Sequence, residues 1–310
     1  MASLLDYAVG DPWEWPHPVR FMGWVIKYYT QIAFRVFRTP VTLRWAGALL
    51  CIGLLSGSAL LGWLVAQGAR VIHPVLGIAV ESIMLATCFA GRSLRAAAEE
   101  VLDPLEAGDL AQARLFLSRY VGRDTNSLSK PEILRAVLET VTENATDGVL
   151  APLFYALVGL AFPRVGSVPL AFAYKAASTL DSTIGYREAP YTDIGWFSAR
   201  VEDTLTWLPC RLSVATLAIF SGEPCYVWQI CQRDAKADPS PNAGWIECAY
   251  AAILGVQMGG TNWYQGIAKQ KPLLGNPTHK ITPVQIYRAL RLTRYSFLVW
   301  LLGALVVQLL

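Results

Sequence analysis

The chain has 310 residues, of which 54% are hydrophobic and only 16% are charged, and its mean hydropathy is +0.37. Soluble domains carry about 25% charged residues, so this chain has more apolar surface than one aqueous fold can bury. The composition therefore predicts an integral membrane protein and excludes a disordered chain, a collagen and a small disulfide scaffold. Lys and Arg number 26 and Asp and Glu 23, and this net charge of +3 excludes a strongly basic nucleic-acid-binding protein.

The cysteines show no metal-binding or disulfide pattern. They form no Cys-x-x-Cys pair, no histidine lies at ligand spacing, and most of them lie in or beside apolar runs. In such runs cysteine behaves as a small hydrophobic residue, so we predict neither a disulfide nor a zinc site. The acidic N-terminal segment has no signal-peptide pattern.

Several apolar runs are candidates for membrane helices. The first two, 46–66 and 71–90, are the clearest, because 46–66 carries no charge and 71–90 is interrupted only by His73 and Glu81. The remaining runs include shorter ones broken by Pro, Gly or polar residues, which suits broken or re-entrant helices buried in protein. They are 149–180, 204–220, 246–260 and 295–310, the last extended by a helix that begins near Thr282. We predict an all-α, polytopic membrane protein of about five spans.

Basic residues predict the orientation of the chain. They gather before the first run, in the segment after the second run and before the last run. Because positive charge marks cytoplasmic loops, we expect these segments in the cytoplasm and the protein in the cell (inner or plasma) membrane, with lipid around it.

We predict that segment 91–147 forms a helical insertion in the cytoplasm. Asp109-x-x-Gln112 and Ser129-x-x-Glu132 are capping boxes that each predict a new helix, and Gly122 is expected to end the middle helix. Without a repeat or a linker, the chain is expected to form one domain over residues 1–310.

One polar cluster lies at the C-terminal end of this insertion. Glu139 and Glu143 share one face of a helix, and Asp147 follows a turn later where the chain turns apolar. Such carboxylates repel one another unless a cation lies between them, and burying them unpaired is costly. A solvated helix face is the alternative. We favour Mg²⁺ or arginine partners, with Arg123 and Arg135 as the nearest arginines.

Three further polar clusters carry candidate residues. The segment from Asp11 to Arg20 is aromatic and Pro-rich and is typical of a membrane interface. The second follows an apolar run, and Lys or Asp within or beside a membrane segment usually indicates a functional site. It comprises Lys175, Ser178, Thr179, Asp181, Ser182, Tyr186, Arg187, Arg200, Glu202, Asp203 and Arg211. The third is the turn from Ser240 to Glu247, with Asn242, which is equally well explained as a helix cap. No Walker A, Gly-x-Gly-x-x-Gly, Gly-x-Ser-x-Gly or His-Glu-x-x-His motif is present.

Taken in order, these segments resemble the CobD/CbiB family of adenosylcobinamide-phosphate synthases of cobalamin biosynthesis. The matching stretches are GDPWEWPHPVRFMG, AGRSLRAAAEEV, VGRDTNSLSKPEILRAVLETVTENATDGVLAPLFYA, AYKAASTLDSTIGYRE, DIGWFSARVEDTLTWLPCRL and SPNAGWIECAYAAILGVQMGG. The chain departs from the family at Ser178, where the family has Asn, and at Glu202-Asp203, where it has two Asp. A hydrophobic helix usually precedes the GDP motif in the family, and here only a short segment does.

The resemblance implies an amide ligase. It would use ATP and Mg²⁺ to join adenosylcobyric acid to (R)-1-aminopropan-2-ol O-phosphate, or to aminopropanol, giving adenosylcobinamide phosphate. As catalytic residues we expect Glu143, Asp147, Lys175 and Asp181, and as metal ligands Glu139, Glu143, Asp147 and Asp181. The residues expected to bind substrates and ATP are Arg92, Arg123, Asp124, Arg135, Asn144, Ser182, Tyr186, Arg200, Asp203 and Asn242.

Two other functional classes remain open. A transporter would place polar residues in both halves of an inverted repeat, whereas here they concentrate in 91–147 and 181–203. A sensor that shares only the fold would not need both the Glu139–Asp147 and the Lys175–Asp181 sets. We expect no nucleic acid partner. A homo-oligomer, or a complex with other membrane enzymes of the pathway, is compatible with the sequence.

Overall fold

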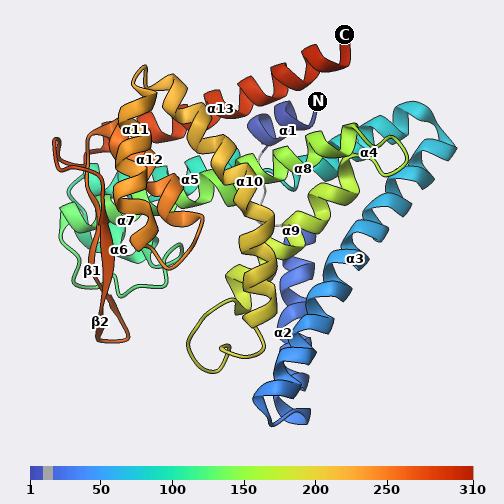
Figure 1. The fold of residues 1–310 in the computed structure, drawn as a ribbon, viewed down its shortest axis with the longest axis horizontal. Coiled ribbons are helices and arrows are strands. Elements are labelled where there is room, and N and C mark those ends of the chain that lie inside the picture. The colour runs from blue at the N-terminus through green and yellow to red at the C-terminus, as the bar shows by residue number, and fades with distance from the viewer. Residues whose placement is uncertain (10–16, 310) are drawn as a thin grey trace. The chain divides into compact units, whose positions relative to one another are not determined.

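The computed structural model describes residues 1–9 and 17–309 (Figure 1). Contacts within the chain group it into two compact units, each made of two stretches. Unit 1 comprises Met1–Ala90 and Ala151–Thr206, and unit 2 comprises Gly91–Leu150 and Trp207–Leu310. The sequence predicted a single domain, because no linker separates these stretches. The two units arise because the 91–150 insertion packs with the C-terminal third of the chain.

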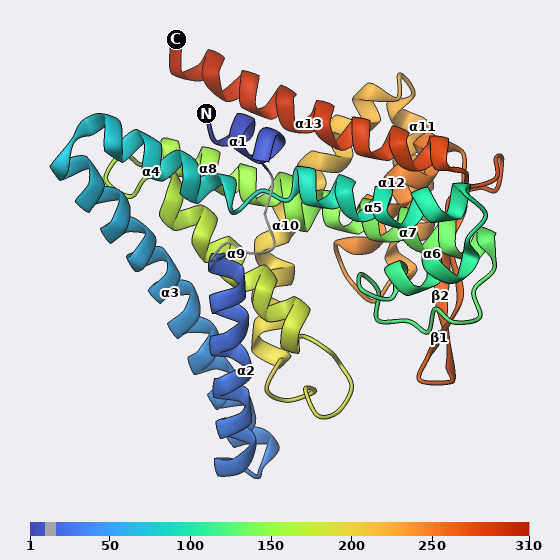
Figure 2. The same ribbon diagram turned by 180° about the vertical axis from the view of Figure 1, so that it is seen from behind.

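All the regular secondary structure in the described residues of unit 1 is helical. Its long helices α2, α3 and α9 pack together, as both views show (Figures 1 and 2). Its elements are α1 (Ala2–Val9), α2 (Pro18–Val36), α3 (Pro40–Ile72), α4 (Pro74–Ala86), α8 (Ala151–Leu160), α9 (Ser167–Ile184) and the first half of α10 (Trp196–Phe220).

Proline at the first helical position begins three helices of unit 1. Its missing N–H and fixed φ suit that position, and the preceding residue caps the helix. The Nδ1 atoms of His17 and His73 accept hydrogen bonds from Val19 N (3.3 Å) and Val75 N (3.2 Å), and Thr39 forms a capping box at α3. These two histidines therefore have a structural role as N-caps.

The core of unit 1 joins α2, α3 and α9 through Ile26, Leu50, Cys51, Leu180 and Ile184, all buried. Gly47 lets the chain at Ile194 approach α3 closely, because a Cβ at Gly47 would lie 1.9 Å from the Ile194 carbonyl oxygen. Small residues thus allow the tight packing of the 185–195 segment that follows the predicted site residues of α9.

Unit 2 combines helices with one β-hairpin. The hairpin lies beside α7 and α12 (Figure 1). Its elements are α5 (Gly91–Glu106), α6 (Leu110–Leu117), α7 (Lys130–Asn144), a π-helical turn (Ala145–Leu150), the second half of α10, α11 (Pro224–Asp234), a 3₁₀ turn (Ala235–Ala237), α12 (Ala243–Leu254), β1 (Met258–Tyr264), β2 (Ile267–Leu274) and α13 (Pro283–Leu309).

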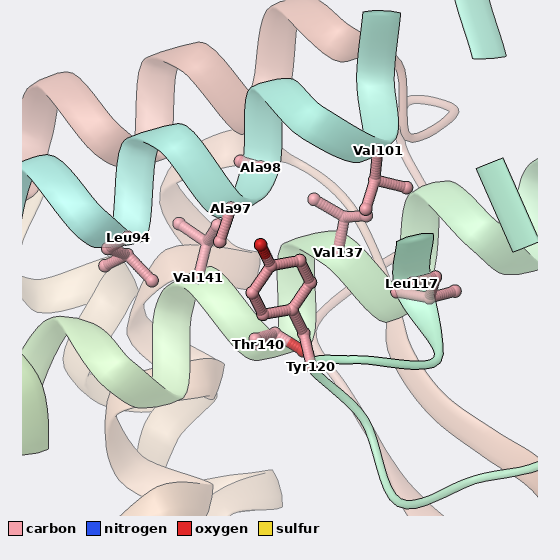
Figure 3. A pocket seen from close by; sticks show the side chains of 9 residues that line it. All are labelled: Leu94, Ala97, Ala98, Val101, Leu117, Tyr120, Val137, Thr140 and Val141. Atoms are coloured by element: carbon pink, nitrogen blue, oxygen red, sulfur yellow. The ribbon is translucent and has the colours of Figure 1, made fainter. Parts of the chain in front are cut away.

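Helix α7 is positioned by its apolar face. Figure 3 shows an apolar pocket in which Val137 and Val141 of α7 face Leu94 and Val101 of α5, with the Tyr120 ring between the helices. The hydroxyl of Tyr120 is hydrogen-bonded to Glu100 of α5. This packing fixes the rotation of α7 and so directs its polar residues to the hairpin.

Both predicted helix starts of the insertion are confirmed, and one of the two is a full capping box. At α6 Asp109 accepts a hydrogen bond from Gln112 N (2.9 Å), which is the N-cap half of the predicted box, and at α7 Ser129 and Glu132 form the reciprocal capping box. The prediction that Gly122 ends the middle helix was wrong, because α6 ends at Leu117 and a turn occupies the next residues.

Within residues 1–9 and 17–309, three helical stretches are long and apolar enough to cross a membrane: Pro40–Ile72, Pro74–Glu106 and Pro283–Gln308. The first contains the predicted run 46–66, the second contains residues 74–90 of the run 71–90, and the third contains residues 295–308 of the run 295–310. Glu81 in the second stretch pairs with Arg70 at 2.6 Å, which explains a charge within an apolar run. The other apolar runs form shorter or less apolar helices, of which α12 is apolar but has 12 residues, against about 20 for a full span. The count of about five spans stays a prediction.

The hairpin corrects the all-α prediction. Apolar run 246–260 predicted a helical piece, but α12 ends at Leu254, and β1 begins four residues later. The two-residue turn is Gln265-Gly266, with φ of 51° and 76°, the left-handed values that a type I′ hairpin turn requires. The prediction missed the hairpin because it treated Gly259-Gly260 as the end of an apolar segment.

Of the predicted interfacial segment from Asp11 to Arg20, residues up to Pro16 lie outside the described part of the chain, and Pro18 to Arg20 begin α2.

Candidate functional site

Several charged side chains of unit 2 lie together between α7 and the β-hairpin. The turn of the hairpin is held by Asp124, whose Oδ1 accepts from Gln265 N (3.0 Å) and whose Oδ2 accepts from Gly266 N (2.8 Å). The Asp124 N–H donates in return to Trp263 O (2.7 Å). Asp124, predicted as a substrate-binding residue, thus uses both carboxylate oxygens to fix the hairpin against the segment before α7.

Glu139 is the buried centre of this arrangement. Its side chain is only 2% exposed, and it forms an ion pair with Arg123, which is 7% exposed. Its Oε1 accepts a hydrogen bond from Gly259 N (2.9 Å). Breaking a buried pair of this kind costs roughly 3–5 kcal/mol, since one charge is left without compensation. The pair therefore links the segment after α6, α7 and the hairpin.

Asn262 of β1 connects two of the arginines that were predicted to bind substrates, Arg123 and Arg135. Its Oδ1 accepts from Arg123 Nη1 (3.0 Å) and from Arg135 Nη2 (3.1 Å), and Arg135 Nη2 also donates to Thr261 O (3.1 Å). Asn262 was not among the predicted site residues, because its partners lie over a hundred residues earlier in the chain.

Glycines allow this approach. Gly259 and Gly260 have φ of 88° and 92°, which few other residues adopt. A Cβ at Gly259 would lie 1.9 Å from Pro272 O, and one at Gly260 would lie 3.1 Å from Arg135 Nη1. The Gly-Gly pair is the sequence signal that could have indicated a close approach of the backbone to a charged site.

A second group of charges extends the cluster along the hairpin. Lys271 of β2 lies 3.5 Å from Oε1 of Glu247, a fully buried residue of α12. Loss of hydration raises the pKa of Glu247 well above its ordinary value, and Lys271 opposes that shift. Burial lowers the pKa of Lys271, but the carboxylates of Glu247, Glu143 and Glu139 outweigh this effect and raise it. Lys271 and Glu247 are thus site residues that the predicted set lacks.

Glu143 belongs to the same electrostatic group. Its side chain retains exposed surface, but protein surrounds it closely. The resulting loss of hydration raises the pKa of Glu143. The positive charge of Lys271 opposes this shift, and the negative charge of Glu139 reinforces it. The predicted neighbours Glu139 and Glu143 therefore differ in environment: one is buried in an ion pair and the other is open to ligands.

The remaining predicted residues of unit 2 lie in different surroundings. Asp147 is half-buried in the π-helical turn, a deformation frequent at functional sites. Asn144 is exposed and donates to Thr140 O (2.9 Å), Arg92 is exposed, and Asn242 is buried before α12.

Unit 1 carries the second predicted set on α9 and α10. Asp181 and Ser182 lie in the last turn of α9, where Ser182 Oγ donates to Thr179 O (3.1 Å), and the Tyr186 hydroxyl donates to Ser182 O (3.1 Å). Lys175 lies earlier on α9 and is half-buried. Gly185 permits the turn, because a Cβ there would lie 2.0 Å from Asp181 Oδ1.

The α10 residues of this set combine opposite charges with aromatic contacts. The guanidinium of Arg200 lies 5.1 Å from the ring centre of Trp196. Burial raises the pKa of Asp203, and Arg187 and Arg200 oppose the shift. Glu202 is buried, hydrogen-bonded to Thr206, and Thr206 in turn lies 2.9 Å from the Tyr174 hydroxyl.

Among the described residues, no group of three or more His, Cys, Asp or Glu side chains is arranged to hold a metal ion. Mg²⁺, however, commonly uses one or two carboxylates and completes its shell with water and substrate phosphate. Both carboxylate oxygens of Glu139 are engaged by Gly259 and Arg123. Exposed Glu143 and half-buried Asp147 suit that limited mode of binding, and Mg²⁺ would supply charge neutralisation of the phosphates there.

No solved structure matches the chain. Among curated relatives, the cobalamin biosynthesis protein CobD of Synechocystis sp. is 53% identical over 99% of this chain and 90% of its own length. CbiB of Salmonella arizonae is 42% identical and CobD of Citrobacter koseri 40% identical, each over 94% of this chain and 91% of its own. The CobD/CbiB family model matches residues 1–293, and the chain therefore belongs to the CobD/CbiB family.

Proposed function

We propose that the protein acts in cobalamin biosynthesis as an ATP- and Mg²⁺-dependent amide ligase. It would join adenosylcobyric acid to (R)-1-aminopropan-2-ol O-phosphate, or to aminopropanol, and give adenosylcobinamide phosphate. Membership of the CobD/CbiB family and relatives named cobalamin biosynthesis proteins support the pathway. The reaction, its substrates and its metal are our inference.

The observation that best supports this chemistry is the pair of largely buried arginines in unit 2. Arg123 and Arg135 are 7% and 15% exposed, and both are oriented by Asn262. Buried, oriented guanidinium groups bind phosphate oxygens in a bidentate manner and are worth more than surface charges. A site of this type suits a ligase whose substrates carry phosphate.

The expected reaction has two steps. A carboxylate oxygen of the corrinoid attacks the γ-phosphorus of ATP, and ADP leaves with the electrons of the broken P–O bond. The amine nitrogen then attacks the acyl carbon, inorganic phosphate leaves, and the nitrogen loses a proton. Arg123 and Arg135 would bind and orient phosphoryl oxygens in these steps, and Lys175 and Asp181 of unit 1 remain proposed catalytic residues.

A metal is proposed at Glu143 and Asp147. These residues lie one turn apart at the junction of α7 and the π-helical turn, and neither is buried as Glu139 is. One or two carboxylates with substrate phosphates satisfy the preferences of Mg²⁺. We also propose that the 91–147 insertion faces the cytoplasm, where ATP is present.

Ligand-dependent ATP consumption tests the proposed class. Purified protein with ATP and Mg²⁺ should release ADP over many turnovers only when adenosylcobyric acid and the amine are both present, because the amine is needed to discharge the acyl phosphate. A transporter or a sensor would consume no ATP in response to the two substrates together. ADP release that ignores both substrates, or no release with both present, contradicts the proposal.

A further inference from the structure

Asn262 has one side-chain atom that the charge cluster of unit 2 leaves without a partner. The side chain is buried, and its Oδ1 accepts hydrogen bonds from Arg123 and Arg135, but its Nδ2 is buried with no hydrogen-bond partner. Buried polar atoms are nearly always paired. An unpaired buried donor between two arginines therefore requires an explanation.

The orientation of this amide is fixed by its neighbours. An amide carries an acceptor oxygen and a donor NH₂ group, and exchanging the two would place NH₂ against two guanidinium donors. Oδ1 must therefore face Arg123 and Arg135. Nδ2 is left to donate elsewhere, and the missing partner must be an acceptor.

The charges around Asn262 predict the sign of that acceptor. Two guanidinium groups, those of Arg123 and Arg135, face a single carboxylate, Glu139. Glu139 pairs closely with Arg123 and lies 3.9 Å from Arg135. The two charged side chains that contact Asn262 are therefore both cationic, and one carboxylate is shared between them. An anion with several acceptor oxygens can bind both to these guanidinium groups and to Nδ2.

We infer that Asn262 binds a phosphoryl group, with Oδ1 orienting Arg123 and Arg135 and Nδ2 donating to a phosphoryl oxygen. The inference rests on the proposed function, because it assigns Asn262 to the phosphate-carrying substrates of that reaction. A phosphoryl group has three terminal oxygens, enough to accept from Nδ2 and from the free N–H groups of both arginines. The glycine at 260 lets β1 pack closely against Arg135, since a Cβ there would lie 3.1 Å from Nη1.

The test is direct binding to the full-length protein in detergent, without turnover. Isothermal titration would measure the affinity of (R)-1-aminopropan-2-ol O-phosphate, of a non-hydrolysable ATP analogue and of unphosphorylated aminopropanol. The informative variant is Asn262→Asp, which keeps an acceptor for both arginines and replaces the NH₂ donor by a negatively charged oxygen. Asn126→Asp, at an exposed position before α7, is the matched control.

We expect Asn262→Asp to lower the binding affinity for at least one of the phosphorylated ligands tenfold or more and to leave the affinity for aminopropanol unchanged. Weakening of the phosphorylated amine alone identifies that substrate as the source of the phosphoryl group, and weakening of the ATP analogue alone identifies the nucleotide. Asn126→Asp should bind all three ligands as the wild type does. Should Asn262→Asp not fold, Asn262→Thr removes the NH₂ donor without adding a charge, and the same loss is expected.

The inference is wrong if the wild type binds neither phosphorylated ligand, or if a folded Asn262 variant binds both with wild-type affinity. These outcomes are separable from failure of the proposed reaction. If the wild type binds a phosphorylated ligand but forms no amide, and Asn262→Asp loses that binding, the phosphoryl site is supported and the proposed ligase reaction is rejected. If the wild type forms the amide and Asn262→Asp binds the phosphorylated ligands as the wild type does, the ligase reaction is supported and the phosphoryl site at Asn262 is rejected.

Discussion

Arg123 and Glu139 form an ion pair with both side chains more than nine-tenths buried, 16 residues apart in the chain. Arg123 lies in the segment that follows α6, and Glu139 lies in the middle of α7. The remaining bonds of the pair go to Asn262 and Gly259 of the hairpin. A single buried pair therefore joins three segments that are distant in sequence, and it sets the geometry of the phosphate site that we propose.

Replacing either arginine by lysine should lower activity. Lysine retains the charge but cannot donate to two partners in the fixed geometry of a guanidinium. In Arg123→Lys one of the bonds to Glu139 and Asn262 is lost, and a hydrogen bond to a charged group is worth about 1.5–3 kcal/mol. We expect kcat/KM for the phosphorylated substrates to fall about tenfold or more.

Arg119→Lys is the matched control for that measurement, because Arg119 is half-exposed in its surface pair with Glu100, and surface pairs contribute little. Wild-type kinetics in both Arg123→Lys and Arg135→Lys would show that these arginines serve the fold alone.

The pair of Lys271 and Glu247 should be energetically coupled. Lys271→Met leaves the buried Glu247 carboxylate without its cation, which should destabilise the protein by roughly 3–5 kcal/mol. Adding Glu247→Gln should restore much of that loss, since no uncompensated charge remains. Denaturant unfolding in detergent of the two single variants and the double variant gives the coupling, and additive effects would show that the two residues do not interact.

The stability of the Lys271→Met variant should also depend on pH. Burial already holds the pKa of Glu247 above its ordinary value, and removal of Lys271 should raise it further. Between the unfolded and folded pKa values the folded state binds more protons, so stability falls as pH rises. The stability deficit of Lys271→Met should therefore shrink as the pH is lowered towards the ordinary pKa of glutamate, and a deficit that grows on acidification contradicts this account.

Glu143→Gln and Asp147→Asn test the proposed metal site. Each change keeps the shape of the side chain and removes one charge, so Mg²⁺ would lose a ligand while the fold is retained. We expect either variant to abolish ATP-dependent amide formation while the protein still inserts into the membrane. Glu106→Gln, an exposed acid of α5, is the control. Normal turnover of both variants at limiting Mg²⁺ would show that these acids are not ligands.

Labelling of an introduced cysteine tests the orientation of the insertion. Ser118 is exposed after α6, and Cys225 is the exposed native cysteine, whereas the other five are buried. In a Cys225→Ser background, we expect a membrane-impermeant maleimide to label Ser118→Cys only after the cells are permeabilised. Ready labelling in intact cells would place the insertion outside.

Local signals predicted much of unit 2. Asp109 and Ser129 begin α6 and α7 as their capping boxes indicated, and the apolar run at the C-terminus is the long helix α13. The spacing of Glu139 and Glu143 placed both on α7. These features depend on residues within one or two helical turns, so the sequence pattern contains them.

The pairing across the site could not be predicted in this way. Asn262 and Arg135 are 127 residues apart, and Gly259 and Glu139 are 120 apart. Nothing local distinguishes Glu139, which is buried and paired, from Glu143, which is open. The hairpin did have a signal, since glycines at 259, 260 and 266 with a two-residue turn fit a strand pair, but a short apolar run fits a helix equally well.

The most direct test of the central claim is the mass of the corrinoid product. Purified protein would be incubated with adenosylcobyric acid, (R)-1-aminopropan-2-ol O-phosphate, ATP and Mg²⁺, and the corrinoid would be analysed by mass spectrometry. The account predicts a corrinoid heavier by the amine minus one water, formed in step with ADP and absent when ATP is omitted. An unchanged corrinoid mass with folded protein and all four components present would contradict it.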